Sequence, residues 1–453
     1  MTLSTWTQFL HKPVPAYRLA IFRMVYGAFM LWEIGYLFAI DFVGKFLTGP
    51  EILFPYDGFG WMPLLPGPVL WLLLFVLGLA CIALIAGWAY RPAALVLGFG
   101  FGYLFFLDKS IYNNHLYLLI LLAFQLYFIE GDRVLAVQAR DKKDGIPTVP
   151  YWMYFLVMAQ IFIVYFYGGL AKLNPDWLIH QQPALELLKQ GSFFSDLIGI
   201  PAAAFILVWG GLVFDLVIGF LLFWRKTFWL AVAGVVFFNV MNSQLFDDIN
   251  IFPYFMLTSL ILFAPNNWIQ EQVTKRWPAP PAPKKTGKTA PVLPAPSPRI
   301  VLWLGIYFGF QLLFPYRHLL VPGNADWTME MQRFSWRMKV QHRSHDALGF
   351  RVMDYTSQTI YPVDLRTFKL NTDQIKLLSN DPAAAWRFAV YLRKFFEKQR
   401  RGARLGVQAN IHVGMNGRAP QHVFNPEFDL GNAKRSLWGH NDWILPLQGE
   451  PRK

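Results

Sequence analysis

FGYLFFLDKSIYNNHLYLLILLAFQLYF, residues 101–128, is one long apolar stretch that a polar cluster interrupts once. An apolar run of about 28 residues is too long for one straight crossing of a bilayer and too short for two full-length ones. We therefore expect two short helices that meet at a polar elbow, residues 108–115, near one face of the membrane. Lys109 lies in this elbow, and an ionisable residue at membrane depth is a candidate functional residue because burying its charge is costly.

The composition of the whole chain is typical of a protein that crosses the bilayer several times. Hydrophobic residues make up 55% of the 453 residues and charged residues only 15%, whereas soluble domains carry about 25% charged residues. The first 15 residues are polar and lead into a full-length apolar helix, so we expect no cleavable signal peptide. The single cysteine, Cys81, excludes a disulfide framework, and no Asn-x-Ser/Thr site occurs. Both features fit a bacterial inner membrane better than a eukaryotic secretory pathway.

Apolar segments divide the chain into a membrane part and a soluble part. We predict a transmembrane bundle over residues 1–277, a flexible Pro- and Lys-rich linker over 278–298, a last transmembrane helix over 299–316 and a soluble domain over 317–453. The predicted fold is a mainly α membrane protein, a polytopic bundle of about eight to nine transmembrane helices, followed by an α+β extracytoplasmic domain. The expected spans are residues 19–40, 69–88, a segment ending at 107, 114–129, 152–170, 201–224, 227–244, 249–264 and 300–314.

The distribution of Lys and Arg predicts the orientation in the membrane. One set of alternate loops holds most of these residues, and the other set holds only Lys45, Lys109, Lys172 and Lys189. Since loops rich in Lys and Arg stay in the cytoplasm, we expect a cytoplasmic N-terminus, with the Lys109 elbow and the soluble domain on the outer, periplasmic side. The net charge of +13 is then partly a topology signal. We expect the lipid bilayer as a partner and no nucleic acid.

The soluble part carries local signals for both helix and strand. Asp381 and Pro382 form an N-cap and N1 pair, and an apolar stripe from Ala385 to Phe395 follows it. Residues 407–413 alternate as a strand does, and Asn416-Gly417 is a hairpin turn signal. These signals predict an α+β domain.

The elbow itself suggests base chemistry at Lys109. If the turn stays helical, Lys109 and Asn113 share a face at i,i+4 spacing. Burial in an apolar pocket disfavours the ammonium form, and a neutral amine can accept a proton from a substrate. The residues alone leave open the alternative that Lys109 snorkels to the membrane edge and only anchors a helix end.

Further polar residues are expected on the outer side of the membrane. Asn242-Ser243-Gln244 ends the seventh span, and Lys172 follows the fifth. With the elbow they predict a pocket that opens outward. Glu33 and Asp215 lie within spans, where packing pairs and function are equally plausible. In the soluble domain, His and Arg side chains in residues 341–345 are able to bind a carboxylate, but they are too few to indicate zinc, and we expect no metal.

Several long motifs resemble the vitamin K-dependent γ-glutamyl carboxylase family, in particular its shorter bacterial-type members with the horizontally transferred transmembrane domain. LDKSIYNNHLYLLILLAFQL resembles the lysine-bearing signature of that family. The other similar motifs occur in the family's order and spacing and are QIFIVYFYGGLAKLNPDW, FFNVMNSQLF, QLLFPYRHLL followed by Trp327, and SWRMKVQHRSH. Weaker similarity continues to Trp443.

The resemblance implies a membrane enzyme of the carboxy-lyase type. A lysine deprotonates a reduced naphthoquinone (reduced vitamin K or a menaquinol-like hydroquinone), which reacts with O₂ and leaves as the 2,3-epoxide. A strong base formed on the way removes the γ-proton of a glutamate in a peptide, and the carbanion takes up CO₂. The matched residues are Lys109 as the catalytic base, Asn113, Asn114, His115, Lys172, Asn242 and Gln244 for the quinol, and Ser335, Trp336, His342, Arg343 and His345 for the glutamate substrate.

Two departures from the family pattern concern the peptide half of this reaction. The animal enzyme reads Val-His-Ser-Arg-Ser-His where this chain reads Val340-Gln341-His342-Arg343-Ser344-His345. The chain also ends soon after Trp443, whereas the animal enzyme continues through a long lumenal region, and the animal disulfide has no counterpart. Oxidation of the quinol is thus better supported than peptide carboxylation. The alternatives are a quinol epoxidase without protein carboxylation and a non-catalytic membrane protein that binds quinone or lipid.

Overall fold

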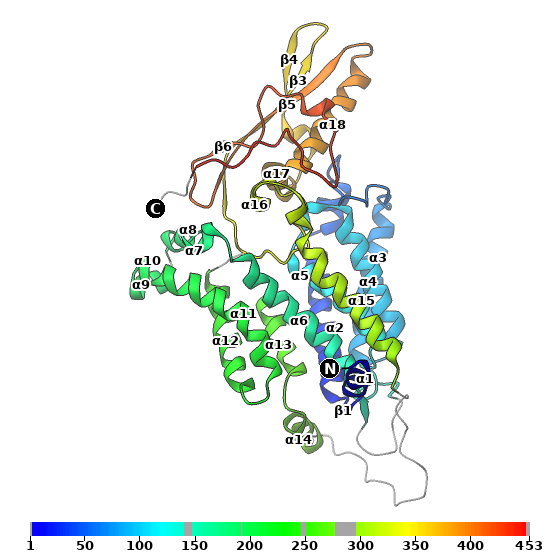
Figure 1. Ribbon diagram of the computed structural model, residues 1–453. Helices are drawn as coiled ribbons and strands as arrows, with labels where there is room; N and C mark the ends of the chain where they lie inside the picture. The colour runs from blue at the N-terminus through cyan, green and yellow to red at the C-terminus, as the bar shows by residue number, and fades with distance from the viewer. Residues whose placement is uncertain (1, 140–146, 192, 246–250, 277–295, 450–453) are drawn as a thin grey trace, which may run out of the picture.

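The fold is a bundle of apolar helices with a smaller sheet-containing domain at one end (Figure 1). The computed structural model describes residues 2–139, 147–191, 193–245, 251–276 and 296–449. Most of the predicted linker over 278–298 therefore lies outside the described residues. The mainly α, multi-pass membrane class with a C-terminal α+β domain is confirmed.

Nine apolar helices of the described chain correspond to the nine predicted spans. Seven are long enough to cross a membrane, and two, α5 and α13, are shorter. The bundle helices are α2 (Tyr17–Ala39), α3 (Gly67–Ala86), α4 (Tyr90–Leu107), α5 (Asn114–Phe128), α6 (Trp152–Ala171), α10 (Ile200–Phe205) continued by η3 (Ile206–Gly210) and α11 (Gly211–Phe223), α12 (Phe228–Leu245), α13 (Phe252–Ser259) continued by η4 (Leu260–Leu262), and α15 (Pro298–Leu313) continued by η5 (Phe314–Leu320).

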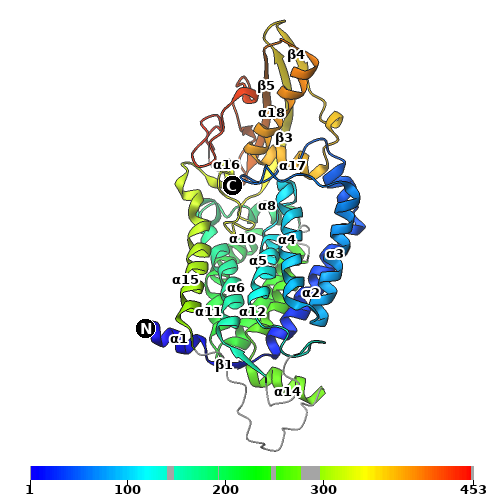
Figure 2. The ribbon, with the colours of Figure 1, turned by 90° about the vertical axis from the view of Figure 1, so that its right-hand side faces the viewer.

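Short elements close the two ends of the bundle (Figures 1 and 2). At the end that carries the N-terminus, strand β1 pairs antiparallel with β2. The short helices α7 and α8 lie at the opposite end, next to the C-terminal domain. The bounds of the short elements are α1 (Leu3–Leu10), β1 (Pro13–Pro15), η1 (Val43–Thr48), η2 (Lys109–Ile111), β2 (Thr148–Pro150), α7 (Pro175–Leu178), α8 (Ala184–Lys189), α9 (Phe193–Ile198), α14 (Asn266–Arg276) and α16 (Ala325–Thr328).

The elbow exists, but its geometry differs from the prediction in two respects. Helix α4 is a full-length span of 18 residues, so only α5 is short. Between the two helices the backbone is not continuously helical, because Asp108 and Asn113 are both extended and cap η2 and α5. Lys109 and Asn113 therefore do not share a helix face.

The C-terminal domain is an antiparallel sheet with two helices packed on it. Its strand order is β4-β3-β5-β6, and the register of the central pair runs from Arg343 opposite Met415 to Asp354 opposite Leu405. Asp381 caps α18 through bonds from the main-chain N–H of Ala383 and Ala384, at 2.8 and 3.1 Å. The elements are β3 (Arg343–Asp354), β4 (Thr359–Pro362), η6 (Leu365–Phe368), α17 (Thr372–Asn380), α18 (Pro382–Gln399), β5 (Leu405–Met415), β6 (Gln421–His422) and η7 (Leu430–Asn432).

Polar contacts dock this domain onto the elbow end of the bundle. Gln374 of α17 donates to the buried carboxylate of Asp108 at 2.8 Å, and Arg418 forms a two-point ion pair with Asp176 at 2.7 and 2.8 Å. Phe54, from the loop between η1 and α3, is buried in the core of the C-terminal domain. The elbow is thus covered by the soluble domain.

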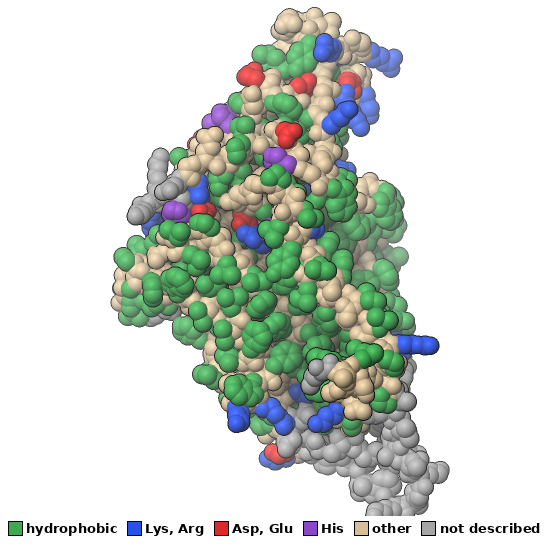
Figure 3. All heavy atoms as spheres, in the orientation of Figure 1, with side chains coloured by type: hydrophobic (Ala, Val, Ile, Leu, Met, Phe, Trp, Pro, Cys, Tyr) green, Lys and Arg blue, Asp and Glu red, His purple; other side chains and the backbone are tan. Residues whose placement is uncertain are grey.

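Hydrophobic side chains cover the face of the bundle seen in Figure 3, whereas charged side chains gather at its two ends. The N-terminus and the C-terminal domain lie at opposite ends (Figure 2), as an odd number of crossings requires. Together with the bias of Lys and Arg in the loops, this arrangement predicts a cytoplasmic N-terminus and a C-terminal domain outside.

A reporter that is active only in the cytoplasm should therefore be active at the N-terminus and inactive at the C-terminus. The reverse pattern would contradict the orientation.

Candidate functional site

Lys109 lies where the elbow meets the C-terminal domain. Its side chain is only 5% exposed, and its main-chain N–H donates to the carbonyl oxygen of Phe54 at 2.7 Å. The neighbouring Asp108 carboxylate accepts bonds from the N–H groups of Ser110 and Phe54, at 2.8 and 3.3 Å, and from Gln374. Asp108 thus anchors the elbow through these three donors.

Two other carboxylates face the Lys109 ammonium group. Its Nζ is 3.8 Å from Oδ2 of Asp381 and 4.0 Å from Oδ1 of Asp57. Both carboxylates already have arginine partners. Arg333 forms an ion pair with Asp381, and Arg435 donates two hydrogen bonds of 2.7 Å to Asp57. Within the described chain, no oxygen accepts a hydrogen bond from Nζ.

This environment disfavours the charged form of Lys109. Burial lowers the pKa of the Lys109 amine, the carboxylates of Asp381 and Asp57 oppose that effect, and the guanidinium groups of Arg333 and Arg435 add to it, so that the pKa lies below its ordinary value. For Asp381, burial acts to raise the pKa, but Lys109 and Arg333 outweigh it and hold the carboxyl ionised. A buried amine that is easily deprotonated is suited to accept a proton from a substrate.

Lys109 forms part of the wall of a cavity that we call the basic cavity, with a volume of about 550 Å³. On the other side of Lys109 lies a smaller cavity of about 270 Å³, lined in part by Asp57, Arg435 and Trp438. The charged residues that line the basic cavity are Lys109, Arg333, Lys339, Arg343, Asp373 and Lys376. Positive charge therefore predominates in it.

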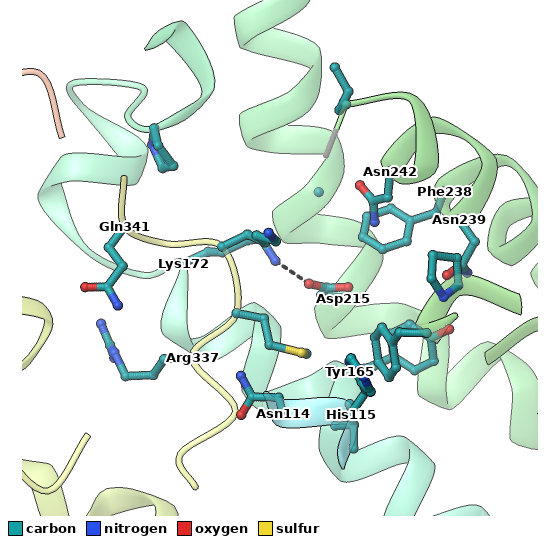
Figure 4. Close-up of a pocket in the computed structure, with 18 of the residues that line it drawn as sticks. Asn114, His115, Tyr165, Lys172, Asp215, Phe238, Asn239, Asn242, Arg337 and Gln341 are labelled. Atoms are coloured by element: carbon teal, nitrogen blue, oxygen red, sulfur yellow. Dashed lines mark hydrogen bonds and ion pairs between the residues drawn. The ribbon is translucent and has the colours of Figure 1, made fainter. Parts of the chain in front are cut away.

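A second, mostly apolar cavity of about 320 Å³ lies among the helices of the bundle (Figure 4). Helices α5, α6, α11 and α12 supply some of its polar residues, and others come from outside these helices, namely Tyr112, Asn113, Lys172, Gln332, Arg337, Lys339 and Gln341. Within it, the buried side chains of Lys172 and Asp215 form an ion pair, and the ammonium group of Lys172 lies 5.2 Å from the ring of Trp177. We call it the apolar cavity. It has the combination of apolar walls and few polar groups that small-molecule sites prefer.

The two cavities are adjacent. Seven residues line both of them: Tyr112, Pro183, Leu187, Leu245, Met329, Lys339 and Gln341. At this junction the buried side-chain carbonyl oxygen of Gln341 has no hydrogen-bond partner among the described residues, while its amide group contacts the sulfur of Met329 at 3.8 Å. A ligand that extends from the apolar cavity toward Lys109 would pass this unpaired acceptor.

The predicted quinol residues converge, with one exception. Asn113, Asn114, His115, Lys172 and Asn242 all line the apolar cavity. Gln244 does not line it, and its side chain is exposed. Their predicted roles are not tested by this geometry and stay predictions.

The predicted glutamate-binding residues are more dispersed. His342 and Arg343 line the basic cavity. Ser335 and Trp336 are buried, and Trp336 packs on Tyr117 with 5.0 Å between ring centroids. His345 lies exposed on β3. The structure thus brings two of the five to the wall next to Lys109.

Arg343 is held in place by main-chain carbonyl groups. It donates to the oxygens of Asn380 and Trp327, at 2.9 and 2.7 Å, and to that of Asp326. Burial lowers the pKa of this guanidinium to about 10. Because both terminal nitrogens are engaged, Arg343 contributes positive charge to the basic cavity rather than a free two-point binding fork.

Sequence reasoning missed the residues that surround the Lys109 amine. Asp57, Arg333 and Arg435 carried no local signal, and Asp381 was recognised only as a helix cap. Asn239, which lines the apolar cavity, was also missed, although it lies in the FFNVMNSQLF motif. Within the described residues, no group of three His, Cys, Asp or Glu side chains is placed to hold a metal ion.

Two family models together match nearly the whole chain. Residues 11–268 match the HTTM domain, and residues 297–450 match the lumenal domain of vitamin K-dependent gamma-carboxylase. No solved structure matches the chain. The first match covers the helical bundle and the second covers α15 with the C-terminal domain, so both halves of the site at Lys109 fall within matched regions. The chain therefore belongs to the vitamin K-dependent gamma-carboxylase family.

Proposed function

We propose that this protein is an integral membrane enzyme that oxidises a reduced naphthoquinone with O₂ and couples this oxidation to the carboxylation of glutamate in a peptide. One hydroquinone and one O₂ give one 2,3-epoxide and one water: one oxygen atom enters the epoxide, and the other leaves as water with the two hydroquinone protons. The γ-proton of glutamate passes to a base formed during this oxidation, and the resulting carbanion adds CO₂. The observation that carries the proposal is the buried Lys109 amine in the wall of a cavity that shares seven lining residues with the apolar cavity.

The apolar cavity fits a flat ring with polar substituents. Its walls include Val164, Phe238 and Met256, which offer van der Waals contact to a ring. Gln341 supplies the unpaired acceptor at the junction, where it is able to accept a hydrogen bond from a hydroxyl group. An unmade hydrogen bond of a buried group is costly, so a hydroxyl ligand at this point would be stabilised.

Lys109 has the features of a general base. Burial and the two arginines lower the pKa of the Lys109 amine, so it gives up its proton more readily than a free lysine does. Once the amine has accepted a proton, Asp381 and Asp57, at 3.8 and 4.0 Å, stabilise the ammonium group. The proton is thus held at Nζ.

The charge of the basic cavity favours an acidic substrate. Lys339, Arg343 and Lys376 line it together with Lys109 and Arg333, against a single acidic residue, Asp373. A cavity of one predominant sign attracts ligands of the opposite sign. This charge supports coupling to a glutamate side chain over oxidation of the quinol alone.

The proposed location is the bacterial inner membrane, with the N-terminus in the cytoplasm and the C-terminal domain in the periplasm. The apolar surface of the bundle (Figure 3) and the bias of the loop charges support it. The basic cavity would then receive peptide from the outside, and the apolar cavity would receive quinol from the bilayer.

Membrane fractions that contain the protein should form quinone epoxide when given reduced vitamin K, O₂, bicarbonate and a Glu-containing peptide. Labelled CO₂ should enter the peptide in the same reaction. Epoxide without label in the peptide would identify a quinol epoxidase that does not carboxylate. Binding of quinone without any epoxide would instead indicate a non-catalytic binding protein and would refute the proposal.

Lys109→Ala should lower epoxide formation by about 10²–10⁴-fold, the usual contribution of a general base. The protein should still fold and insert, because Asp381 and Asp57 keep their arginine partners when the amine is removed. The matched control is Lys369→Ala, which removes an exposed lysine and should retain activity. Added ammonia or small amines should restore part of the lost rate. Near wild-type turnover of purified Lys109→Ala would exclude the lysine from the reaction, and low yield with normal specific activity would indicate a helix anchor.

Gly211→Leu should weaken quinol binding, since Gly211 lines the apolar cavity. A Cβ at this position meets Trp177 and Lys172 only at ordinary contact distances, 3.8 and 3.9 Å, so the rest of the new side chain would occupy the cavity. Overpacking of about 1–3 kcal/mol corresponds to a rise in KM for quinol of roughly 5- to 150-fold, with a smaller effect on kcat. Gly305→Leu is the control, because Gly305 has open space around it. An unchanged KM in Gly211→Leu would place the quinol elsewhere.

A further inference from the structure

The carboxylates next to Lys109 are occupied by other partners at the same oxygen atoms that face the amine. Oδ2 of Asp381, the atom nearest to Nζ, is also the atom bound by Arg333. Its Oδ1 caps α18. Oδ1 of Asp57, at 4.0 Å from Nζ, accepts a bond of 2.7 Å from Arg435, and Oδ2 accepts the second bond of the same guanidinium.

The position of these arginines determines the charge that Lys109 experiences. An unpartnered carboxylate within about 4–6 Å of a lysine holds it protonated and raises its pKa by roughly 1–3 units. Here each carboxylate is matched by one guanidinium, so the four groups sum to no net charge. The Lys109 amine then experiences mainly its burial, which disfavours the ammonium form.

Other charged and titratable groups face the same space from every neighbouring element. The elbow contributes Asp108 and Tyr112, the loop before α3 contributes Tyr56, and the walls of the two cavities contribute Arg317, Glu330, Lys339, His342, Arg343, Asp373 and Lys376. Asp108 is engaged by three donors. Among the described residues, only Asp57 and Asp381 have carboxylate oxygens within 4.0 Å of Nζ.

We infer that Arg333 and Arg435 are positioning residues that favour the neutral, proton-accepting form of Lys109 by occupying Asp381 and Asp57. The inference deepens the proposed function, because it matters for turnover only if Lys109 is the base. Arg333 contributes more than Arg435, since Asp381 is 2% exposed and Asp57 is 48% exposed, and water screens the exposed pair.

The test measures the amine directly, on the full-length protein in detergent or in lipid discs. Trace acetylation with acetic anhydride modifies only neutral amines, so the labelling of Lys109 against pH, followed by mass spectrometry, gives its titration midpoint. The exposed Lys45 and Lys369 serve as references in the same chain. The wild-type midpoint of Lys109 should lie below the value of about 10.4 for a free lysine.

Removing either arginine should move this midpoint to higher pH. Arg435→Gln frees Asp57 to pair with Lys109 and should give a shift of about 1 unit, and Arg333→Met should give a larger one. The double variant Asp57→Asn with Arg435→Gln removes one negative and one positive charge, and its midpoint should return close to that of the wild type. Arg351→Gln is the control, since Arg351 pairs with Glu427 far along the sheet and its loss should leave Lys109 unchanged.

The pH dependence of turnover should shift in parallel with the labelling midpoint of Lys109. Activity rises with pH as Lys109 loses its proton, so a midpoint raised by 1 unit lowers the rate at neutral pH by about tenfold while the plateau at high pH is retained. An unchanged Lys109 midpoint in Arg435→Gln, or a double variant shifted as far as the single one, would overturn the inference. If Arg333→Met fails to fold, Arg435→Gln and the double variant Asp57→Asn with Arg435→Gln are sufficient to test the inference. Shifted labelling with unchanged turnover would instead leave the inference standing and remove Lys109 from the proposed reaction.

Discussion

The docking of the C-terminal domain onto the α4–α5 elbow is the contact on which the site depends. Asp108 is buried there because Gln374 and the main chain of Phe54 satisfy its carboxylate, and a buried carboxylate without such donors would be strongly destabilising. This contact places Lys109 beside the cap of α18. The C-terminal part of the chain also supplies Asp381, Arg333 and Arg435, three of the charged groups around the amine. The chemistry of the elbow therefore requires both halves of the chain.

The sequence predicted the membrane part well because hydropathy is a local property. All nine expected spans correspond to apolar helices, and the cap at Asp381 and the strand around residues 407–413 formed where their local signals indicated. The error concerned α4. It was expected to be short, but it spans 18 residues and includes Pro92 in its first turn, where the missing N–H of proline removes no helical hydrogen bond. The span is therefore longer than the sequence suggested.

The site was predictable only where its residues share a helix end or a motif. Five predicted residues meet at one cavity because they lie at or near helix termini on the same side of the bundle. They are Asn113, Asn114, His115, Lys172 and Asn242. Gln244 fails for a geometric reason, since two residues along a helix amount to a turn of about 200°. The partners of Lys109 had no such signal. Asp57 and Arg435 are 378 positions apart, and only tertiary structure brings them together.

One arrangement of positive charge serves two purposes around Lys109. A base needs surroundings that disfavour its own cation, and a site for an acidic substrate needs an excess of cations nearby. Arg333 satisfies both needs, because its like charge lowers the pKa of Lys109 and it lines the basic cavity, where Arg343 and Lys376 add further positive charge that attracts carboxylates. Buried Asp381 and half-exposed Asp57 limit this effect, since their carboxylates remain close enough to stabilise the proton after its transfer. The balance of charges therefore follows from two opposite demands on a single amine.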